Sequence, residues 1–167
     1  DVARNQFLSG NIIKQAALAE TLERFARGGS EDFYRGETAG RLVADMKRDG
    51  GLIREADLAA YRVIEREPVA FDYQNYRVIS APLPSSGGMT LAHVFGQLKD
   101  DDLKAMHATD RAHLLIETMK RAYRDRNAHM GDSDFVEIPD LLNAERLKSI
   151  RSGIAMEKST PSAELGN

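Results

Sequence analysis

The sequence lacks cysteine and tryptophan, and only 5 of its 167 residues are proline. The missing cysteine excludes disulfide bonds, thiolate metal sites and a cysteine nucleophile. Neither sign of charge dominates, because the formal net charge is only −3, and nothing indicates a basic surface for nucleic acid. No apolar run is long enough to cross a bilayer. We therefore expect neither a nucleic-acid partner nor a membrane span in this segment.

The remaining composition is that of an ordinary globular protein. Apolar residues make up 42% of the chain and charged residues 29%. A length of 167 residues is enough for one domain with a real core. The chain begins at Asp1 with no signal peptide, which is typical of an excised or processed segment.

Apolar periodicity predicts a mainly helical α+β fold with five or six helices and one β-hairpin. Glycine pairs at 28–29 and 50–51 are expected to end two of the helices, and Ser30 is expected to cap the segment after the first pair. The predicted helices cover residues 14–27, 39–46, 55–61, 89–99, 109–129 and 143–152.

The hairpin is predicted where the apolar period changes from helical to alternating. Residues 62–71 are expected to form a strand interrupted by Pro68, and residues 76–80 the return strand. Residues 72–75 are the expected turn.

The longest predicted helix begins at a cap formed by Thr109 or Asp110. Its basic run, residues 120–126, is interpreted as a solvated face with local ion pairs. Its expected buried face consists of Ala112, Leu115, Ile116, Met119 and Tyr123.

The chain is organised around an elbow at residues 80–89, where a strand gives way to a helix. Ser85 or Ser86 can cap that helix, and Gly87 and Gly88 permit backbone angles or close approaches that a side chain blocks. The same geometry could bind an anion or present a serine nucleophile. However, no lysine follows the last glycine and no serine is flanked by glycines, so a structural turn is favoured.

Other candidate ligands are isolated. None of the four histidines, His93, His107, His113 and His129, pairs with another at a spacing suited to zinc. Asp132 and Asp134 resemble the start of a calcium loop, but its remaining ligands are missing. We therefore predict no metal and no cofactor.

Several blocks, in this order, resemble the γ-glutamyltransferase (γ-glutamyl transpeptidase) family. Each block is short, but together they extend from about Lys14 to Leu165. The blocks are residues 17–22, 33–36, 50–53, 57–61, 65–68, 82–88, 122–126 and 131–136.

The resemblance implies a segment of an N-terminal-nucleophile hydrolase with an αββα fold. Members are made as precursors that cleave themselves into a large and a small subunit. The new N-terminal threonine of the small subunit attacks the γ-glutamyl amide of glutathione or related compounds, and its own amine serves as the base. The γ-glutamyl group then passes to water, an amino acid or a peptide. A periplasmic or extracellular location is also implied.

This chain resembles the C-terminal part of the large subunit. Residues 1–154 are expected to form a single segment, and residues 155–167 a polar tail or linker toward the processing site. The small subunit is then the expected partner, and a γ-glutamyl compound the substrate of the whole enzyme. The isolated segment is predicted to be inactive and to expose an apolar patch or to self-associate.

The sequence departs from the family pattern, and these departures limit which residue roles of the family can be assigned to this chain. The sequence contains no Thr-Thr pair, so the nucleophile motif is missing and no catalytic residue maps onto this chain. A cephalosporin-acylase-like enzyme, a capsule-polymer transpeptidase and a non-catalytic helical binding module remain alternatives. A parent gene that continues past Asn167 into a Thr-Thr-His-Tyr-type block would favour an enzyme.

Overall fold

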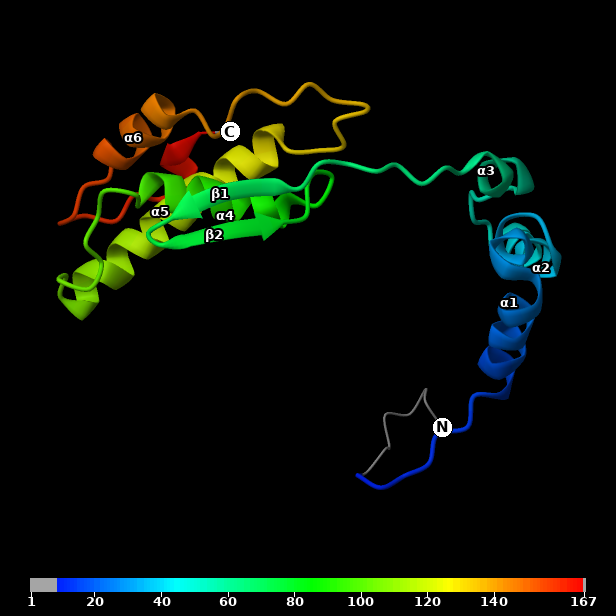
Figure 1. Cartoon of the computed structure of the whole chain (residues 1–167). Coiled ribbons are helices and arrows are strands. Elements are labelled where there is room, and N and C mark those ends of the chain that lie inside the picture. Colours follow the sequence, from blue (N-terminus) through cyan, green and yellow to red (C-terminus); the bar gives the residue numbers. More distant parts are fainter. Residues whose placement is uncertain (1–8, 167) are drawn as a thin grey trace. The chain divides into compact units, whose positions relative to one another are not determined.

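The chain forms helices and one small sheet, which a computed structural model describes for residues 9–166 (Figure 1). The chain divides into two units, Asp1–Ile64 and Glu65–Asn167, and each is described by itself. The first contains α1 (Ala16–Tyr34), α2 (Glu37–Arg48) and α3 (Glu55–Ala60). The second contains β1 (Val69–Tyr73), β2 (Tyr76–Ser80), α4 (Ser86–Gln97), α5 (Ala108–His129), α6 (Ala144–Ser152) and the 3₁₀ helix η2 (Ser162–Leu165). The mainly helical α+β prediction is confirmed.

The N-terminal unit has little interior of its own. Ala39 and Leu58 are its buried hydrophobic residues within the described part, whereas Leu18 and Leu22 on α1 are 50% and 56% exposed. The rings of Tyr34 and Tyr61 stack with centroids 5.4 Å apart and join the end of α1 to the residue after α3. The small core of this unit therefore leaves much of its apolar surface exposed.

A glycine kink divides α1, as the Gly28–Gly29 pair predicted. Gly29 has φ 60° and ψ −152°, which is outside the helical region and costs glycine less than other residues. A second helical stretch follows and continues to Tyr34, so the glycine pair ends the first stretch as predicted, and α1 consists of two helical stretches joined at a kink. The Ser30 hydroxyl forms no hydrogen bond among the described residues, and the cap predicted there is not formed.

The C-terminal unit is built on an antiparallel hairpin. Register pairs Val69 with Ser80 and Tyr73 with Tyr76, so only Gln74 and Asn75 form the turn. Gln74 has a positive φ of 53°, which a tight two-residue hairpin turn requires. The return strand has the bounds that the sequence predicted.

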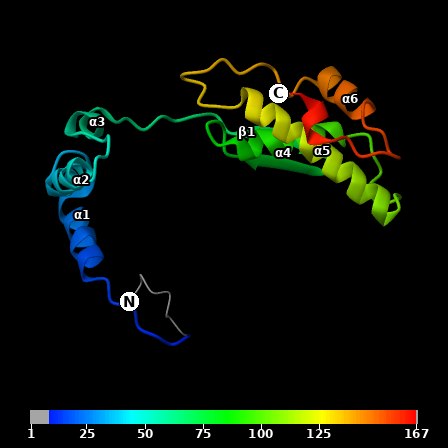
Figure 2. The same ribbon diagram turned by 180° about the vertical axis from the view of Figure 1, so that it is seen from behind.

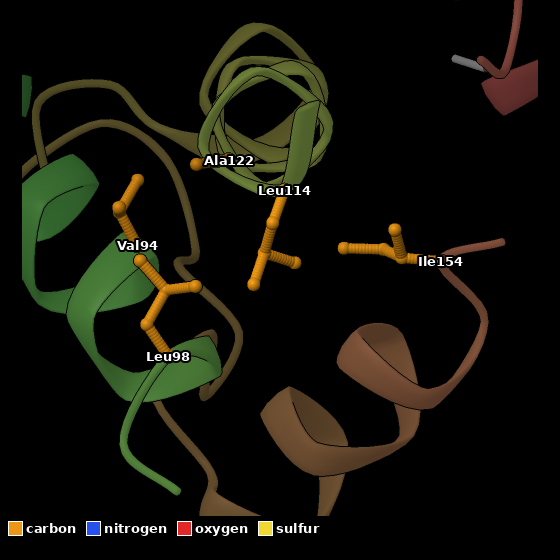
Figure 3. Close-up of a cluster of buried hydrophobic side chains, with 5 residues drawn as sticks. All are labelled: Val94, Leu98, Leu114, Ala122 and Ile154. Atoms are coloured by element: carbon orange, nitrogen blue, oxygen red, sulfur yellow. The ribbon is translucent and has the colours of Figure 1, made fainter. Parts of the chain in front are cut away.

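Helix α4 lies between the hairpin and α5, as the two opposite views show (Figures 1 and 2). Tyr73 of β1 packs on Phe95 of α4 with ring centroids 4.5 Å apart. The other side of α4 contributes to the hydrophobic core (Figure 3). That core consists of Val94, Leu98, Leu114, Ala122 and Ile154.

Helix α6 approaches α4 closely at a glycine. A Cβ atom placed on Gly96 would lie 2.4 Å from Leu147 Cδ1, which no ordinary packing allows. Leu147 is only 4% exposed, so the missing side chain at position 96 lets α6 bury its apolar residue against α4. The Asn143 side chain caps α6 by accepting from the Arg146 amide at 3.1 Å.

Several predicted boundaries were wrong, among them the hairpin turn, which covers residues 74–75 and not 72–75. Strand β1 begins only after Pro68, because proline has no N–H for a ladder and restricts the residue before it. Helix α4 begins at Ser86, so both elbow glycines are helical. The cap of α5 is His107, whose Nδ1 accepts from the Thr109 amide at 3.4 Å, and neither Thr109 nor Asp110 fills that role.

The segment from residue 155 to 166 is mostly exposed and contains η2. Its Thr160 is joined to α5 by hydrogen bonds, so this polar stretch is attached to the helix surface. None of the described helices combines the length and hydrophobicity needed to cross a membrane.

Candidate functional site

The elbow serines do not form the predicted cap. Ser85 occupies the N-cap position of α4, but its hydroxyl accepts no hydrogen bond from the first helical turn. The Ser86 hydroxyl instead accepts from Arg126 Nε at 3.0 Å, which joins the start of α4 to α5. Within residues 9–166, neither hydroxyl is hydrogen bonded to a histidine or a carboxylate that could serve as a base. This geometry supports the structural interpretation of the elbow.

The two elbow glycines have different roles. A Cβ atom on Gly88 would lie 2.5 Å from the Ala81 carbonyl oxygen and 3.0 Å from Ser80 Cβ, so this position needs glycine for close approach. A Cβ atom on Gly87 would meet nothing within 4 Å. Neither glycine has a positive φ.

The polar centre of this unit is a buried histidine–aspartate pair. His93 on α4 places Nε2 2.8 Å from Asp125 Oδ2 on α5, and both residues are almost fully buried. Burial lowers the pKa of His93, and the positive charges of Arg146 and Arg124 act in the same direction against the attraction of Asp125. A neutral His93 with its proton on Nε2 therefore donates to the Asp125 carboxylate.

The other contacts of this pair leave no free catalytic atom. Gln97 Nε2 lies 2.8 Å from His93 Nδ1 and donates to it when the proton is on Nε2 of the ring. Arg124 and Arg146 donate to Asp125 at 2.7 and 2.5 Å. Burial by itself raises the pKa of Asp125, but hydrogen bonds from Arg124, Arg146 and His93 outweigh it and lower the pKa. The pair therefore joins helices and has no open face toward a substrate.

A second buried carboxylate, Glu117, lies two turns earlier on α5. Arg121 and Lys120 donate to its two oxygens, each at 2.7 Å. The Ser159 hydroxyl and the Thr160 amide also donate to it, each at 3.2 Å. Burial raises the pKa of Glu117, but the hydrogen bonds from Lys120, Arg121 and Thr160 hold it far below its usual range.

The predicted orientation of α5 was wrong at most positions, although Leu115 does pack against the core. Its buried side is Leu114, Glu117, Thr118, Arg121, Ala122 and Asp125. Ile116, Met119 and Tyr123, which were expected in the core, are 52%, 43% and 53% exposed. The interpretation of residues 120–126 as a solvated face was therefore also wrong at Arg121 and Asp125. The signal that could have revealed this is the spacing of Glu117, Arg121 and Asp125 at four-residue intervals, which places three complementary charges on one side of a helix.

Outward-facing residues of α5 border a groove. The groove has a volume of about 730 Å³ and is closed on its other side by η2. Its lining includes Ile116, Met119, Tyr123, Arg124, Ser162 and Leu165.

The acidic loop after α5 is an anchor for the segment that leads into the hairpin. Arg66 donates to Asp132 at 3.0 Å, to Asp134 at 2.6 and 3.0 Å, and to the Ser133 hydroxyl at 3.0 Å. The two aspartates that resembled a calcium loop thus bind a guanidinium group.

The remaining histidines do not assemble with other ligands. His113 Nε2 lies 2.9 Å from the Ala155 carbonyl oxygen, and His107 caps α5. No group of three or more histidine or acidic side chains that could hold a metal ion occurs in the described part of the chain.

The chain is similar to known proteins of one family. The model of the gamma-glutamyltranspeptidase family matches residues 3–167. The chain is 39% identical over 160 residues to the glutathione hydrolase proenzyme of Escherichia coli strain K12. That match covers 93% of this chain but only 28% of the relative, so the chain spans little more than a quarter of the curated protein.

Solved structures of the same group have a similar fold. The gamma-glutamyltranspeptidase of Helicobacter pylori matches with a TM-score of 0.87 and 36% identity, over 96% of this chain and 49% of that one. The cephalosporin acylase of Bacillus halodurans matches with a TM-score of 0.79 and 31% identity, over 87% of this chain and 27% of that one. The fold is therefore shared between transpeptidases and acylases.

Proposed function

This chain belongs to the gamma-glutamyltranspeptidase family, and we propose that it is a structural part of a self-processing γ-glutamyltransferase precursor. The whole enzyme would cleave γ-glutamyl amides such as glutathione and transfer the γ-glutamyl group to water, an amino acid or a peptide. The nucleophile, an N-terminal threonine, would come from the small subunit. Residues 155–167 would lead toward the processing site.

The observation that carries this proposal is the difference between two coverage values. The chain covers 28% of the E. coli proenzyme but 49% of the solved H. pylori chain, so that solved chain is markedly shorter than a proenzyme. Such a difference is what a precursor divided into separate chains produces, and it supports a role for this chain in one of them.

The geometry supports a structural role within that enzyme. A general base must reach the proton that it removes. His93 and Asp125 are buried, and His93 Nδ1 is already occupied by Gln97. The elbow serines have no base beside them among the described residues. The chain would therefore brace the catalytic part and supply no reacting group.

The direct test is complementation. The 167-residue chain alone should not hydrolyse a γ-glutamyl anilide, and the full-length precursor should. Separate expression of this chain and the rest of the precursor, followed by mixing, should restore part of the activity. A precursor in which the nucleophilic threonine is replaced by alanine is the matched control, since it should assemble and remain inactive.

Two outcomes would contradict the proposal. Turnover by the isolated chain would show that it contains its own nucleophile. A full-length precursor that cleaves a cephalosporin side-chain amide and not the γ-glutamyl anilide would favour an acylase. The second test matters because the cephalosporin acylase is among the structural relatives.

A further inference from the structure

We propose that the groove between α5 and η2 is a docking site for an apolar segment from the rest of the precursor, and that Glu117 assembles this site. The proposal rests on the proposed function, because it takes its partner from the same precursor. The floor of the groove is the stripe of Ile116, Met119 and Tyr123 on α5. The opposite wall is formed by Ser162, Leu165 and Gly166.

The floor has the spacing of a helix face that normally packs against protein. Residues 116, 119 and 123 are three and four positions apart, so they lie one above the other on one side of α5. All three are about half exposed, although the opposite side of α5 already contributes Leu114 and Ala122 to the core. The helix is therefore apolar on two sides, and only one of them is covered within this unit.

The wall of the groove formed by η2 is held in place by a buried carboxylate, that of Glu117. The chain that leads into η2 is held at Ser159 and Thr160 by Glu117, which is 1% exposed. Lys120 adds bonds to the Ser159 hydroxyl at 3.2 Å and to the Thr160 carbonyl oxygen, and Arg121 donates to the Thr160 hydroxyl at 3.3 Å. One carboxylate thus organises two cations and two successive residues of the returning chain. A second contact holds η2 itself, since Arg124 donates to the Leu165 carbonyl oxygen at 3.4 Å.

The lining of the groove favours an apolar polypeptide, because its exposed side chains are largely apolar and its cations are already engaged by carboxylates of α5. Lys120 and Arg124 line the groove, but Lys120 is paired with Glu117 and Arg124 with Asp125. Each carboxylate also holds a second cation, Arg121 at Glu117 and Arg146 at Asp125, so both groove cations are engaged although their charge is not cancelled. The surface that remains for a partner is the apolar stripe and Leu165.

The greater length of the relatives indicates that the docking partner is another part of the same precursor. This chain spans only 28% of the E. coli proenzyme, so most of such a precursor lies outside it and is joined to it before processing. A segment of the same precursor is present at high effective concentration. A second copy of this chain has no such advantage. Binding of a second copy is therefore treated as a contradicting result in the test below.

The test is photo-crosslinking in the full-length precursor. Tyr123→p-benzoylphenylalanine places a crosslinker on the groove floor, and Tyr76→p-benzoylphenylalanine, at the 74% exposed hairpin residue, is the matched control. The Tyr123 probe should give a crosslink to a peptide outside this chain, mapped by mass spectrometry, with a yield several-fold above that of the control. A crosslink only within this chain, or to a second copy of it, would overturn the proposal.

Two further variants test the assembly of the groove. Glu117→Gln and Leu165→Asp should each reduce the Tyr123 crosslinking yield several-fold. Glu117→Gln weakens the hydrogen bonds that hold the chain leading into η2, and Leu165→Asp places a charge on the apolar wall of the groove. Leu91→Asp, at an exposed apolar residue of α4 outside the groove, should leave the yield unchanged. If Glu117→Gln does not fold, Leu165→Asp carries the test, and an unchanged yield in Leu165→Asp would overturn the proposal.

The same preparations separate this proposal from the proposed function. Hydrolysis of a γ-glutamyl anilide with no Tyr123 crosslink would overturn the docking site alone. A Tyr123 crosslink in a precursor that processes itself but does not act on γ-glutamyl amides would overturn the proposed activity and leave the docking site supported.

Discussion

His93 Nε2 on α4 and Asp125 Oδ2 on α5 are 2.8 Å apart, inside a unit where both residues are almost fully buried. A neutral histidine that donates to a buried carboxylate is a directional contact, unlike the apolar contacts around it. Because Arg124 and Arg146 donate to the same carboxylate, Asp125 connects α4, α5 and α6. This connection yields predictions about stability and its dependence on pH.

Asp125→Asn should destabilise the protein strongly. The substitution keeps the volume of the side chain but leaves Arg124 and Arg146 without their shared anion, and breaking a buried ion pair in this way costs about 3–5 kcal/mol. Urea unfolding of the two proteins measures the difference. Asp49→Asn is the control, because its ion pair with Arg48 is mostly exposed and its loss should have no measurable effect. Equal stability of the Asp125 variant and the original protein would contradict the assigned role.

The stability of the protein should fall when the pH drops below the pKa of an ordinary histidine. The pKa of His93 is lowered in the folded state, so the unfolded chain binds a proton first, near pH 6.5. The free energy of unfolding should therefore decrease as pH falls from about 6.5 toward the folded-state pKa of His93. Glu117 and Asp125 have lowered pKa values, so their contributions are present above about pH 4 and are lost in more acidic solution.

The measurement for this pH dependence is urea unfolding at pH 5 and pH 7. His93→Gln can still donate to Asp125 but cannot titrate, so its stability should change less between these two values. NMR of the ring nitrogens should show His93 neutral, with the proton on Nε2, at pH 6.5. A positively charged His93 at that pH would contradict the prediction.

The two elbow glycines should respond oppositely to alanine. Gly88→Ala should destabilise by about 1–3 kcal/mol, because the new Cβ atom would press on the Ala81 carbonyl oxygen. Gly87→Ala meets open space inside a helix and should be neutral or stabilising by up to about 1 kcal/mol. Thermal unfolding of this matched pair checks the assignment, and a larger loss for Gly87→Ala would refute it.

The elbow serines should be dispensable for chemistry. Ser85→Ala removes no hydrogen bond seen in the structure and should change stability by less than about 0.5 kcal/mol. Ser86→Ala removes the exposed contact with Arg126 and should also have a small effect. Both variants, made in the full-length precursor, should keep turnover of a γ-glutamyl anilide. Lost turnover with an unchanged melting temperature would instead identify a serine nucleophile.

Local sequence signals determined the secondary structure well where the cause is local. The stripe through Ala39, Leu42 and Met46 predicted the helix at residues 39–46, which lies within α2, because a helix that packs on one side must repeat its apolar residues at that interval. The return strand at residues 76–80 followed from alternation. The succession of blocks also indicated the family, which the match to residues 3–167 confirms.

The tertiary structure alone decided which side of α5 is buried. The apolar stripe of Ile116, Met119 and Tyr123 predicted the core side, but the buried side contains Glu117 and Asp125. Burial of these charges is favourable only because their partners arrive from elsewhere in the chain, His93 and Arg146 for Asp125 and Thr160 for Glu117. Spacing along a helix determines which residues share a face, but the partners that make a charged face suitable for the core lie 32, 21 and 43 residues away, and only folding brings them together.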